Sequence, residues 1–174
     1  RYTPFSPTRR PQELLTIAHR ILGTGQVSLA KFLFICDDEG GPNVNNEEEY
    51  FIHFLERVDW TQDLHFQTKT TIDTLDYSGD GLNEGSKVVI ASAGNIKRKL
   101  CDNLKKIELP SGFSNAQLVS KGNLVVEGIG DVNHLIFSLE KANLDQVGLI
   151  TLVDDSNFVC HDFSNWLWVT FTRS

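Results

Sequence analysis

The stretch KFLFICDD, residues 31–38, joins an unbroken apolar run to a pair of carboxylates. The run from Phe32 to Cys36 is typical of a strand buried on both faces, as in parallel sheets that helices cover. Before it, from Pro11 to Gly23, apolar residues recur at helical spacing. After it, three glutamates suit the positive N-terminal end of a helix dipole. They are predicted to begin a second helix, which has one apolar face. These two predicted faces consist of Leu14, Leu15, Ala18, Ile21 and Leu22, and of Tyr50, Phe51, Phe54, Leu55 and Val58.

The same order returns in the second half around VGLITLVDD, residues 147–155. A short strand is expected at 123–128, and a helix at 131–142 with Val132, Leu135, Ile136 and Leu139 on one face. An aromatic helix is expected at 161–173. Helix, buried strand, Asp-Asp and aromatic helix thus occur at 12–58 and at 131–173, which indicates an internal duplication with sub-repeats 12–93 and 124–174. Convergence of two ordinary βα units would give the same pattern, and both explanations stay open.

Further strands are expected at 63–68 and 87–92, and a charged surface helix at 95–104. Strands that alternate with helices predict an α/β fold: an open doubly wound sheet with helices on both faces, forming one domain over residues 1–174. The chain opens without Met and stops inside a predicted helix, which suggests a piece of a longer protein.

The loop DYSGDGLNEGSK, residues 76–87, resembles two ligand-binding loops in part. An EF-hand loop needs a bidentate carboxylate at its twelfth position, where this sequence has Lys87. A phosphate-binding P-loop needs four residues between its glycines, and only three separate Gly81 from Gly85. The loop is therefore predicted to be a connection into the strand at 87–92.

The amino-acid composition limits the classes of protein to which this chain can belong. The chain has 174 residues, 40% of them hydrophobic, and a net charge of −7. Such a chain can bury a core, which excludes a disordered protein, and its short basic clusters at Arg9-Arg10, Lys97–Lys99 and Lys105-Lys106 argue against a nucleic-acid surface. No membrane-spanning segment or signal peptide is recognisable, so a soluble, cytoplasmic protein is expected. The cysteines, expected as free thiols, are Cys36, Cys101 and Cys160.

Few residues could carry chemistry. The acidic pairs Asp37-Asp38 and Asp154-Asp155 follow buried strands, where an open α/β sheet binds ligands, and could hold Mg²⁺. Alternatively one aspartate of each pair caps the next turn or helix. The run Cys160-His161-Asp162 has the residue types of a catalytic triad, but adjacent side chains rarely face one another. His53 and His134 are expected to be packing residues, and Trp166 and Trp168 to be core or interface anchors.

The second half resembles a segment of UbiD-type decarboxylases, in which a buried strand ends in Val-Asp-Asp and an Asp, an aromatic residue and a Trp-containing helix closed by Thr-Arg follow. The first half resembles the same family through LAKFLFICDDE, ERVDWTQDLHF and the loop into KVVIAS. The loop before Asp162 is one residue longer than in the family, and Phe163 replaces a usual Trp. The residues that carry the resemblance in the second half are Val153, Asp154, Asp155, Asp162, Phe163, Trp168, Thr172 and Arg173.

This resemblance implies the C-terminal α/β domain of a 3-octaprenyl-4-hydroxybenzoate-type carboxy-lyase, which mediates oligomer contacts and closes over the active site. It implies non-oxidative decarboxylation of an aromatic or unsaturated acid with prenylated FMN, a divalent metal and K⁺ in the full-length parent, and an inactive isolated domain. The family's catalytic Arg and Glu residues belong to another domain. Implied partners are the rest of the polypeptide and further copies, with peripheral membrane association if the substrate is prenylated.

The family also implies a lysine before the Val-Asp-Asp strand that reaches the cofactor phosphate. By spacing from Asp154 this position is Lys141, although the dipole at a helix C-terminus would favour a lysine there in any case. A different class of function, a receiver-like or oligomerisation module that binds Mg²⁺ through the acidic pairs, is the alternative.

Overall fold

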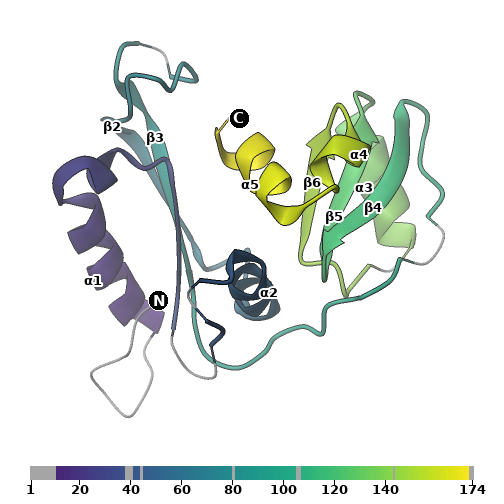
Figure 1. Cartoon of the computed structure of the whole chain (residues 1–174), viewed down its shortest axis with the longest axis horizontal. Helices are drawn as coiled ribbons and strands as arrows, with labels where there is room; N and C mark the ends of the chain where they lie inside the picture. Colours follow the sequence, from purple (N-terminus) through teal and green to yellow (C-terminus); the bar gives the residue numbers. More distant parts are fainter. Residues whose placement is uncertain are drawn as a thin grey trace. The chain divides into compact units, whose positions relative to one another are not determined.

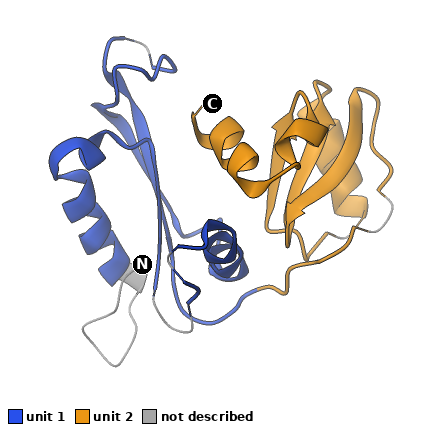
Figure 2. Ribbon diagram, in the orientation of Figure 1, with its two compact units in different colours: residues 1–97 blue, residues 98–174 orange. Residues whose placement is uncertain are grey.

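The computed structural model describes residues 11–37, 41–43, 45–79, 81–104, 107–142 and 144–172. The chain divides into two compact units, residues 1–97 and 98–174 (Figure 2). The α/β class is confirmed, but the described strands form two sheets of three strands each instead of one open doubly wound sheet. None of the described helices is both long enough and apolar enough to cross a membrane.

Unit 1 contains a mixed three-stranded sheet in the order β1-β3-β2 (Figure 1). The edge strand β1 runs parallel to the central strand β3, and β2 pairs with β3 in antiparallel orientation. The elements of unit 1 are α1 (Pro11–Leu22), the 3-10 helix η1 (Gly25–Leu29), β1 (Phe32–Cys36), α2 (Glu47–Arg57), β2 (Leu64–Thr71) and β3 (Glu84–Ser92).

Helices cover both faces of the unit 1 sheet. On one face, α1 packs its predicted apolar stripe against Ile35, Val89 and Ala91. On the other face, the ring of Phe34 contacts two rings of α2, with centroids 5.6 Å from Phe51 and 5.2 Å from Phe54. Both apolar helix faces predicted from the sequence therefore pack against the strands, and these predictions are confirmed.

Unit 2 contains a second mixed sheet, in the order β4-β5-β6, with β5 parallel to β6 and antiparallel to β4. Its elements are β4 (Phe113–Ser120), β5 (Asn123–Gly128), α3 (Val132–Lys141), β6 (Leu149–Val153), the short helix α4 (Ser156–Val159) and α5 (Phe163–Thr172). The central strand of each sheet is thus the second strand of a hairpin and has a parallel neighbour on its other side. A duplication would produce this correspondence, and so would two independent βα units, so the duplication stays a prediction.

The core of unit 2 differs from expectation in one helix. Leu135 and Leu139 of α3 are buried against β4 and β5, as predicted. Val132 and Ile136, predicted on the same face, are 47% and 48% exposed. The sheet therefore buries only some of the apolar residues on this face of α3.

Two sequence-based assignments need correction. The helix expected at 95–104 is wrong, because this described segment is irregular. Its backbone N–H groups bond to distant residues, Lys97 to the carbonyl of Glu56 and Cys101 to that of Gln146. Strand β4 was not expected, because its sequence FSNAQLVS alternates poorly; a tight turn through Lys121 and Gly122, where Gly122 has φ +64°, joins it to β5.

Candidate functional site

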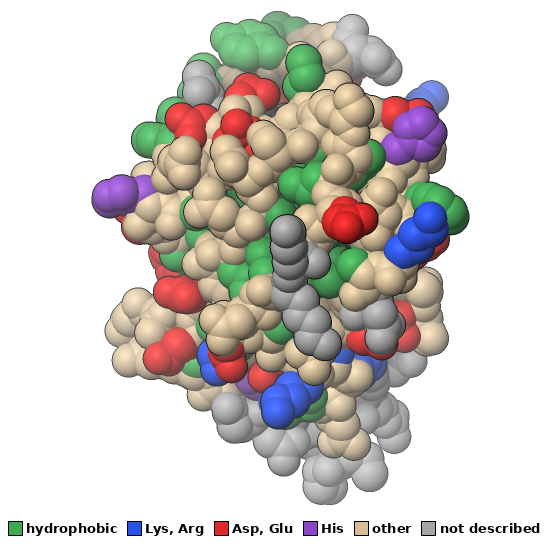
Figure 3. Space-filling view, turned by 90° about the vertical axis from the view of Figure 1, so that its right-hand side faces the viewer, with side chains coloured by type: hydrophobic (Ala, Val, Ile, Leu, Met, Phe, Trp, Pro, Cys, Tyr) green, Lys and Arg blue, Asp and Glu red, His purple; other side chains and the backbone are tan. Residues whose placement is uncertain are grey.

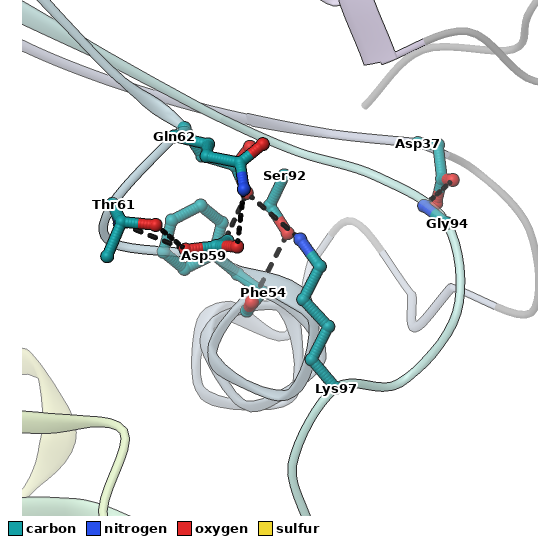
Figure 4. A network of polar contacts seen from close by, with 9 residues as sticks. Asp37, Phe54, Asp59, Thr61, Gln62, Ser92, Gly94 and Lys97 are labelled. Carbon is teal, nitrogen blue, oxygen red and sulfur yellow. Dashed lines mark hydrogen bonds and ion pairs between the residues drawn. The ribbon is translucent and has the colours of Figure 1, made fainter.

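The carboxyl ends of parallel strands are where an α/β sheet usually binds ligands, and each unit has one such edge. In unit 1 this edge holds Asp37, whose side chain is buried, the residue being only 2% exposed. Its Oδ2 accepts a hydrogen bond from the backbone N–H of Gly94 at 2.8 Å, and its own N–H donates to the carbonyl of Ser92 at 3.3 Å (Figure 4). Asp37 thus fastens the end of β1 to the chain that leaves β3. Asp38 lies outside the described residues.

The surroundings of Asp37 are buried and contain a histidine. The Nε2 atom of His53, on α2, lies 3.9 Å from Oδ1 of Asp37, and both side chains are buried. Burial raises the pKa of the Cys36 thiol, which keeps it protonated at neutral pH and a poor nucleophile. The hydroxyl of Tyr50 donates to the carbonyl of Phe34 at 3.1 Å, and burial also raises its pKa. The contacts of His53 and Tyr50 hold α2 against β1. None of these groups forms a nucleophile–base pair.

In unit 2 one residue of the acidic pair has a structural role. Asp155 is the N-cap of α4: its Oδ1 accepts hydrogen bonds from the N–H groups of Asn157 and Phe158, each at 3.0 Å. Asp154 is exposed. Within the described parts of the chain, no three His, Cys, Asp or Glu side chains lie close enough together to hold a metal ion. The capping interpretation of Asp155 is confirmed, and the geometry argues against Mg²⁺ binding by this pair.

Sequence reasoning missed Glu127, which is the centre of the polar cluster at this edge. Its Oε2 accepts hydrogen bonds from the backbone N–H of Ser156 at 3.1 Å, from the Ser156 hydroxyl at 2.9 Å and from the side-chain amide of Asn115 at 3.2 Å. These hydrogen bonds, led by that of the Ser156 N–H, hold the pKa of Glu127 below its ordinary value. Glu127 pairs with Val153 in the parallel register, so the end of β5 reaches the start of α4. In the sequence, the only signal for this cluster was a carboxylate at the end of the strand predicted at 123–128.

Lys141 is the last residue of α3, and its side chain is exposed. Its Nζ lies 4.2 Å from the centroid of the Phe137 ring, one turn earlier, in a cation–π contact. A helix C-terminus presents carbonyl groups, so it adds no N–H donors for a phosphate beside this lysine. The described neighbours therefore do not form a phosphate cradle, and the assignment of Lys141 to a cofactor phosphate stays a prediction.

The triad-like run has no catalytic geometry. Nδ1 of His161 lies 3.7 Å from Oδ2 of Asp162, and both side chains are more than half exposed. Oδ1 of Asp162 accepts the N–H of Asn165 at 2.9 Å, at the start of α5. Burial raises the pKa of the Cys160 thiol. The expectation that His134 is a packing residue is wrong: its side chain is 76% exposed, and its Nδ1 lies 4.0 Å from Oδ2 of Asp131.

The loop of residues 76–87 is a connection into β3, as predicted. Two of its side chains contact Lys31 of unit 1. The Nζ of Lys31 donates a hydrogen bond to the Ser78 hydroxyl at 2.8 Å and lies 3.6 Å from Oδ2 of Asp76. Hydrogen bonds from Ser78 lower the pKa of Asp76. An open polar hollow of about 630 Å³ lies beside this loop, lined by Thr68, Lys69, Thr70, Thr71, Ser78, Gly79, Asn83, Glu84, Gly85 and Ser86.

The charged side chains on one face of the protein bear on nucleic-acid binding. Acidic side chains predominate over basic ones on the face that Figure 3 shows. Lys97, from one of the short basic clusters, forms an ion pair with Asp63 at 3.3 Å. Arg9-Arg10 and Lys105-Lys106 lie outside the described residues. The face in Figure 3 is therefore unlike a nucleic-acid interface, which needs clustered and available cations.

Comparisons with known proteins agree on one family. The family described as the 3-octaprenyl-4-hydroxybenzoate carboxy-lyase C-terminal domain, UbiD_C, matches residues 5–92. An uncharacterized protein of Chlamydia muridarum is 37% identical over 94% of this chain and 28% of its own length. A Chlamydia pneumoniae protein, named as one of the subunits of a 4-hydroxybenzoate decarboxylase, is 32% identical over 93% of this chain and 27% of its own length. The chain thus spans little more than a quarter of these relatives.

One solved structure, the open form of a vanillic acid decarboxylase from Sedimentibacter hydroxybenzoicus, is 18% identical with a TM-score of 0.45. That match covers 59% of this chain and 22% of the decarboxylase chain. The family match covers half of the chain and contains all the described helices and strands of unit 1. The chain therefore belongs to the UbiD family, as a member of its C-terminal domain family.

Proposed function

We propose that this chain is the C-terminal domain of a prenylated-FMN-dependent carboxy-lyase that removes CO₂ from an aromatic or unsaturated carboxylic acid. The observation that carries the proposal is the family match over residues 5–92. The name of the Chlamydia pneumoniae relative suggests 4-hydroxybenzoate as a first substrate to test. Flavin and acid–base groups are expected in the remaining three quarters of the polypeptide, because the relatives are that much longer.

The residues described above support a scaffolding role for this domain. The buried carboxylate of Asp37 and the cluster around Glu127 hold strand ends and helix starts together. Neither forms a nucleophile–base pair or a ring of metal ligands. In the parent enzyme we expect the domain to position and close other parts of the protein over the substrate, while prenylated FMN supplies the electron sink for decarboxylation.

The test compares the 174-residue chain with the full-length parent. Each is incubated with prenylated FMN and 4-hydroxybenzoate, and flavin binding, CO₂ release and phenol formation are measured. We expect turnover from the parent and neither tight flavin binding nor turnover from the domain alone, because catalysis needs cofactor and proton donor in one geometry. A parent that binds the flavin but decarboxylates no member of a panel of aromatic and unsaturated acids would refute the activity. Flavin bound tightly by the domain alone would refute the division of roles.

The Mg²⁺-binding receiver module is not favoured by the contacts of the described residues. Asp155 uses its Oδ1 to cap the start of α4, and Asp37 is buried and bonded to Gly94. Titration of Mg²⁺ against the amide chemical shifts of Asp37, Asp154 and Asp155 separates the two functions. Saturable shifts at these residues would favour the receiver module instead.

A further inference from the structure

The polar hollow of unit 1 lies on the β2–β3 hairpin, where the hairpin extends beyond β1 (Figure 1). Strand β1 pairs with the part of β3 from Val88 to Ser92, whereas the start of β3, from Glu84, pairs with β2. The volume of the hollow, about 630 Å³, is in the range of small-molecule sites, about 300–1,000 Å³. The hollow is therefore large enough to hold a small ligand.

An irregularity of β2 shapes one side of this hollow. The register of β2 against β3 shifts between Gln67 and Thr70, so that Thr68 and Lys69 stand opposite the single residue Ser86. Such a bulge bends the strand and changes the direction of its side chains, and bulges are frequent beside binding sites. All three bulge residues line the hollow.

The loop between the strands forms the other side. Asn83 has φ +60°, in the left-handed region that is uncommon for residues other than glycine. A Cβ atom at Gly79 would overlap the carbonyl oxygen of Glu84, so the loop lies directly against β3. Lys31 holds the loop through its 2.8 Å hydrogen bond to the Ser78 hydroxyl. Because these contacts fix the wall before any ligand arrives, little ordering cost remains to be met on binding.

The lining of the hollow decides which class of ligand fits. Its charged side chains are one lysine, Lys69, and one glutamate, Glu84, and their charges cancel. An anion would be repelled by Glu84 and a cation by Lys69, which favours a neutral ligand. Hydroxyl groups both donate and accept hydrogen bonds, as the hydroxyl groups of such a ligand require. The lining residues that carry a hydroxyl group are Thr68, Thr70, Thr71, Ser78 and Ser86.

Two exposed aromatic residues flank these hydroxyl groups. Phe66, which is 66% exposed, pairs with Val88, and Val88 shares a face of β3 with Ser86. Tyr77, which is 87% exposed, precedes Ser78 in the loop. A sugar ring has hydroxyl groups around its edge and C–H groups on its faces, and an exposed aromatic ring offers such a face an apolar surface. Hydroxyl groups and aromatic rings side by side thus match a sugar.

We propose that the hollow of the β2–β3 hairpin binds a neutral saccharide or polyol. The ligand exchanges hydrogen bonds with the threonine and serine hydroxyl groups, and its C–H face packs against the ring of Tyr77. Because the hollow is open and polar, binding should be weak, with millimolar dissociation constants. The site is separate from the strand ends that hold Asp37 and Glu127 and does not rest on the proposed decarboxylase activity.

The test titrates the isotope-labelled 174-residue chain with small molecules and follows its amide chemical shifts. The neutral probes are glucose, maltose and sorbitol, and the charged probes are inorganic phosphate, gluconate and glucosamine at matched ionic strength. We expect saturable shifts from at least one neutral probe, confined to the amides of residues 68–71, 77–79 and 83–86. The charged probes should bind more weakly, because each meets a like charge in the lining.

Two variants locate the site. Tyr77→Ala removes the ring and Ser86→Ala removes a lining hydroxyl group, and each should raise the dissociation constant at least about threefold. The matched controls are Phe158→Ala, which removes an exposed ring of unit 2, and Ser164→Ala, which removes an exposed hydroxyl group of α5. Both controls should bind as the wild type does, and circular dichroism must show that every variant is folded.

Three results would overturn the proposal. The first is that no neutral probe gives saturable shifts at the hollow. The second is that a charged probe binds there as tightly as the neutral ones, which would assign the hollow to another ligand class. The third is that folded Tyr77→Ala and Ser86→Ala variants keep the wild-type affinity, which would place the binding elsewhere.

Discussion

The carboxylate of Asp37 and the backbone N–H of Gly94 are joined by a partly buried hydrogen bond of 2.8 Å across the carboxyl ends of β1 and β3 (Figure 4). The corresponding residue of the second acidic pair, Asp154, is exposed. Two aspartates in the same sequence pattern thus have different roles. Of the two, Asp37 is the one that fastens the strands of its unit together.

This difference predicts unequal effects of truncation. Asp37→Ala removes the side-chain acceptor of the partly buried Gly94 N–H and should lower the free energy of unfolding by about 1–3 kcal/mol. Asp154→Ala, the matched control, should change it by no more than about 0.5 kcal/mol. Urea denaturation followed by circular dichroism measures both. Equal losses from the two variants would contradict the structural role of Asp37.

The Glu127 cluster predicts a pH dependence with a definite sign. Hydrogen bonds from Ser156 and Asn115 lower the pKa of Glu127 in the folded protein. Stability from this carboxylate is therefore fully present above the ordinary glutamate pKa of about 4.3, and is lost as the pH falls through the lower folded value. Glu127→Gln should be less stable than the wild type at neutral pH, and the gap should close in acid.

Urea midpoints of the wild type and Glu127→Gln, measured from about pH 7 to about pH 3, test this sign. Glu140→Gln, an exposed change on α3, is the control and should show a small difference throughout. A gap between the wild type and Glu127→Gln that stays constant over the whole range would mean that the charge of Glu127 contributes nothing to stability.

Trp166 is a core residue and not an oligomer contact. It is 0% exposed, and its indole N–H donates to the hydroxyl of Thr151 at 3.1 Å. Trp166→Ala should cost about 3–5 kcal/mol of stability, the range for removing a large buried aromatic side chain. Trp168→Ala, at a site that is 50% exposed, should cost much less. Chemical denaturation ranks the two; a Trp168 variant that is the less stable would overturn this assignment.

Lys141 is tested in the full-length parent through its affinity for prenylated FMN. If its ammonium contacts the cofactor phosphate, Lys141→Ala should weaken binding by roughly tenfold to more than a hundredfold, because a charge-assisted hydrogen bond contributes about 1.5–3 kcal/mol. The salt dependence of binding should also fall. Lys121→Ala, which breaks an exposed 2.9 Å ion pair with Asp102, is the control. Unchanged affinity in the Lys141 variant would assign this lysine to the helix surface and its contact with Phe137.

The sequence by itself determined the parts of each unit that depend on neighbours along the chain. Apolar runs predicted β1 and β6, helical spacing predicted α1 and α2, and the asparagine and aspartate preceding α2 and α4 cap them locally. These features follow from backbone geometry and from side chains a few residues apart. The lysine in place of a calcium-binding carboxylate at Lys87 likewise sufficed to exclude an EF-hand.

Only the tertiary structure decided how these parts combine. It divided the strands between two sheets, paired the polar strand β4 with β5, and left 95–104 irregular because Lys97 and Cys101 bond to distant carbonyls. It also brought Glu127 to Ser156 and placed α3 over β4 and β5 instead of β6. The physical reason is the same in each case: the deciding hydrogen bonds and apolar contacts join residues far apart in the sequence, so periodicity and propensity cannot specify them.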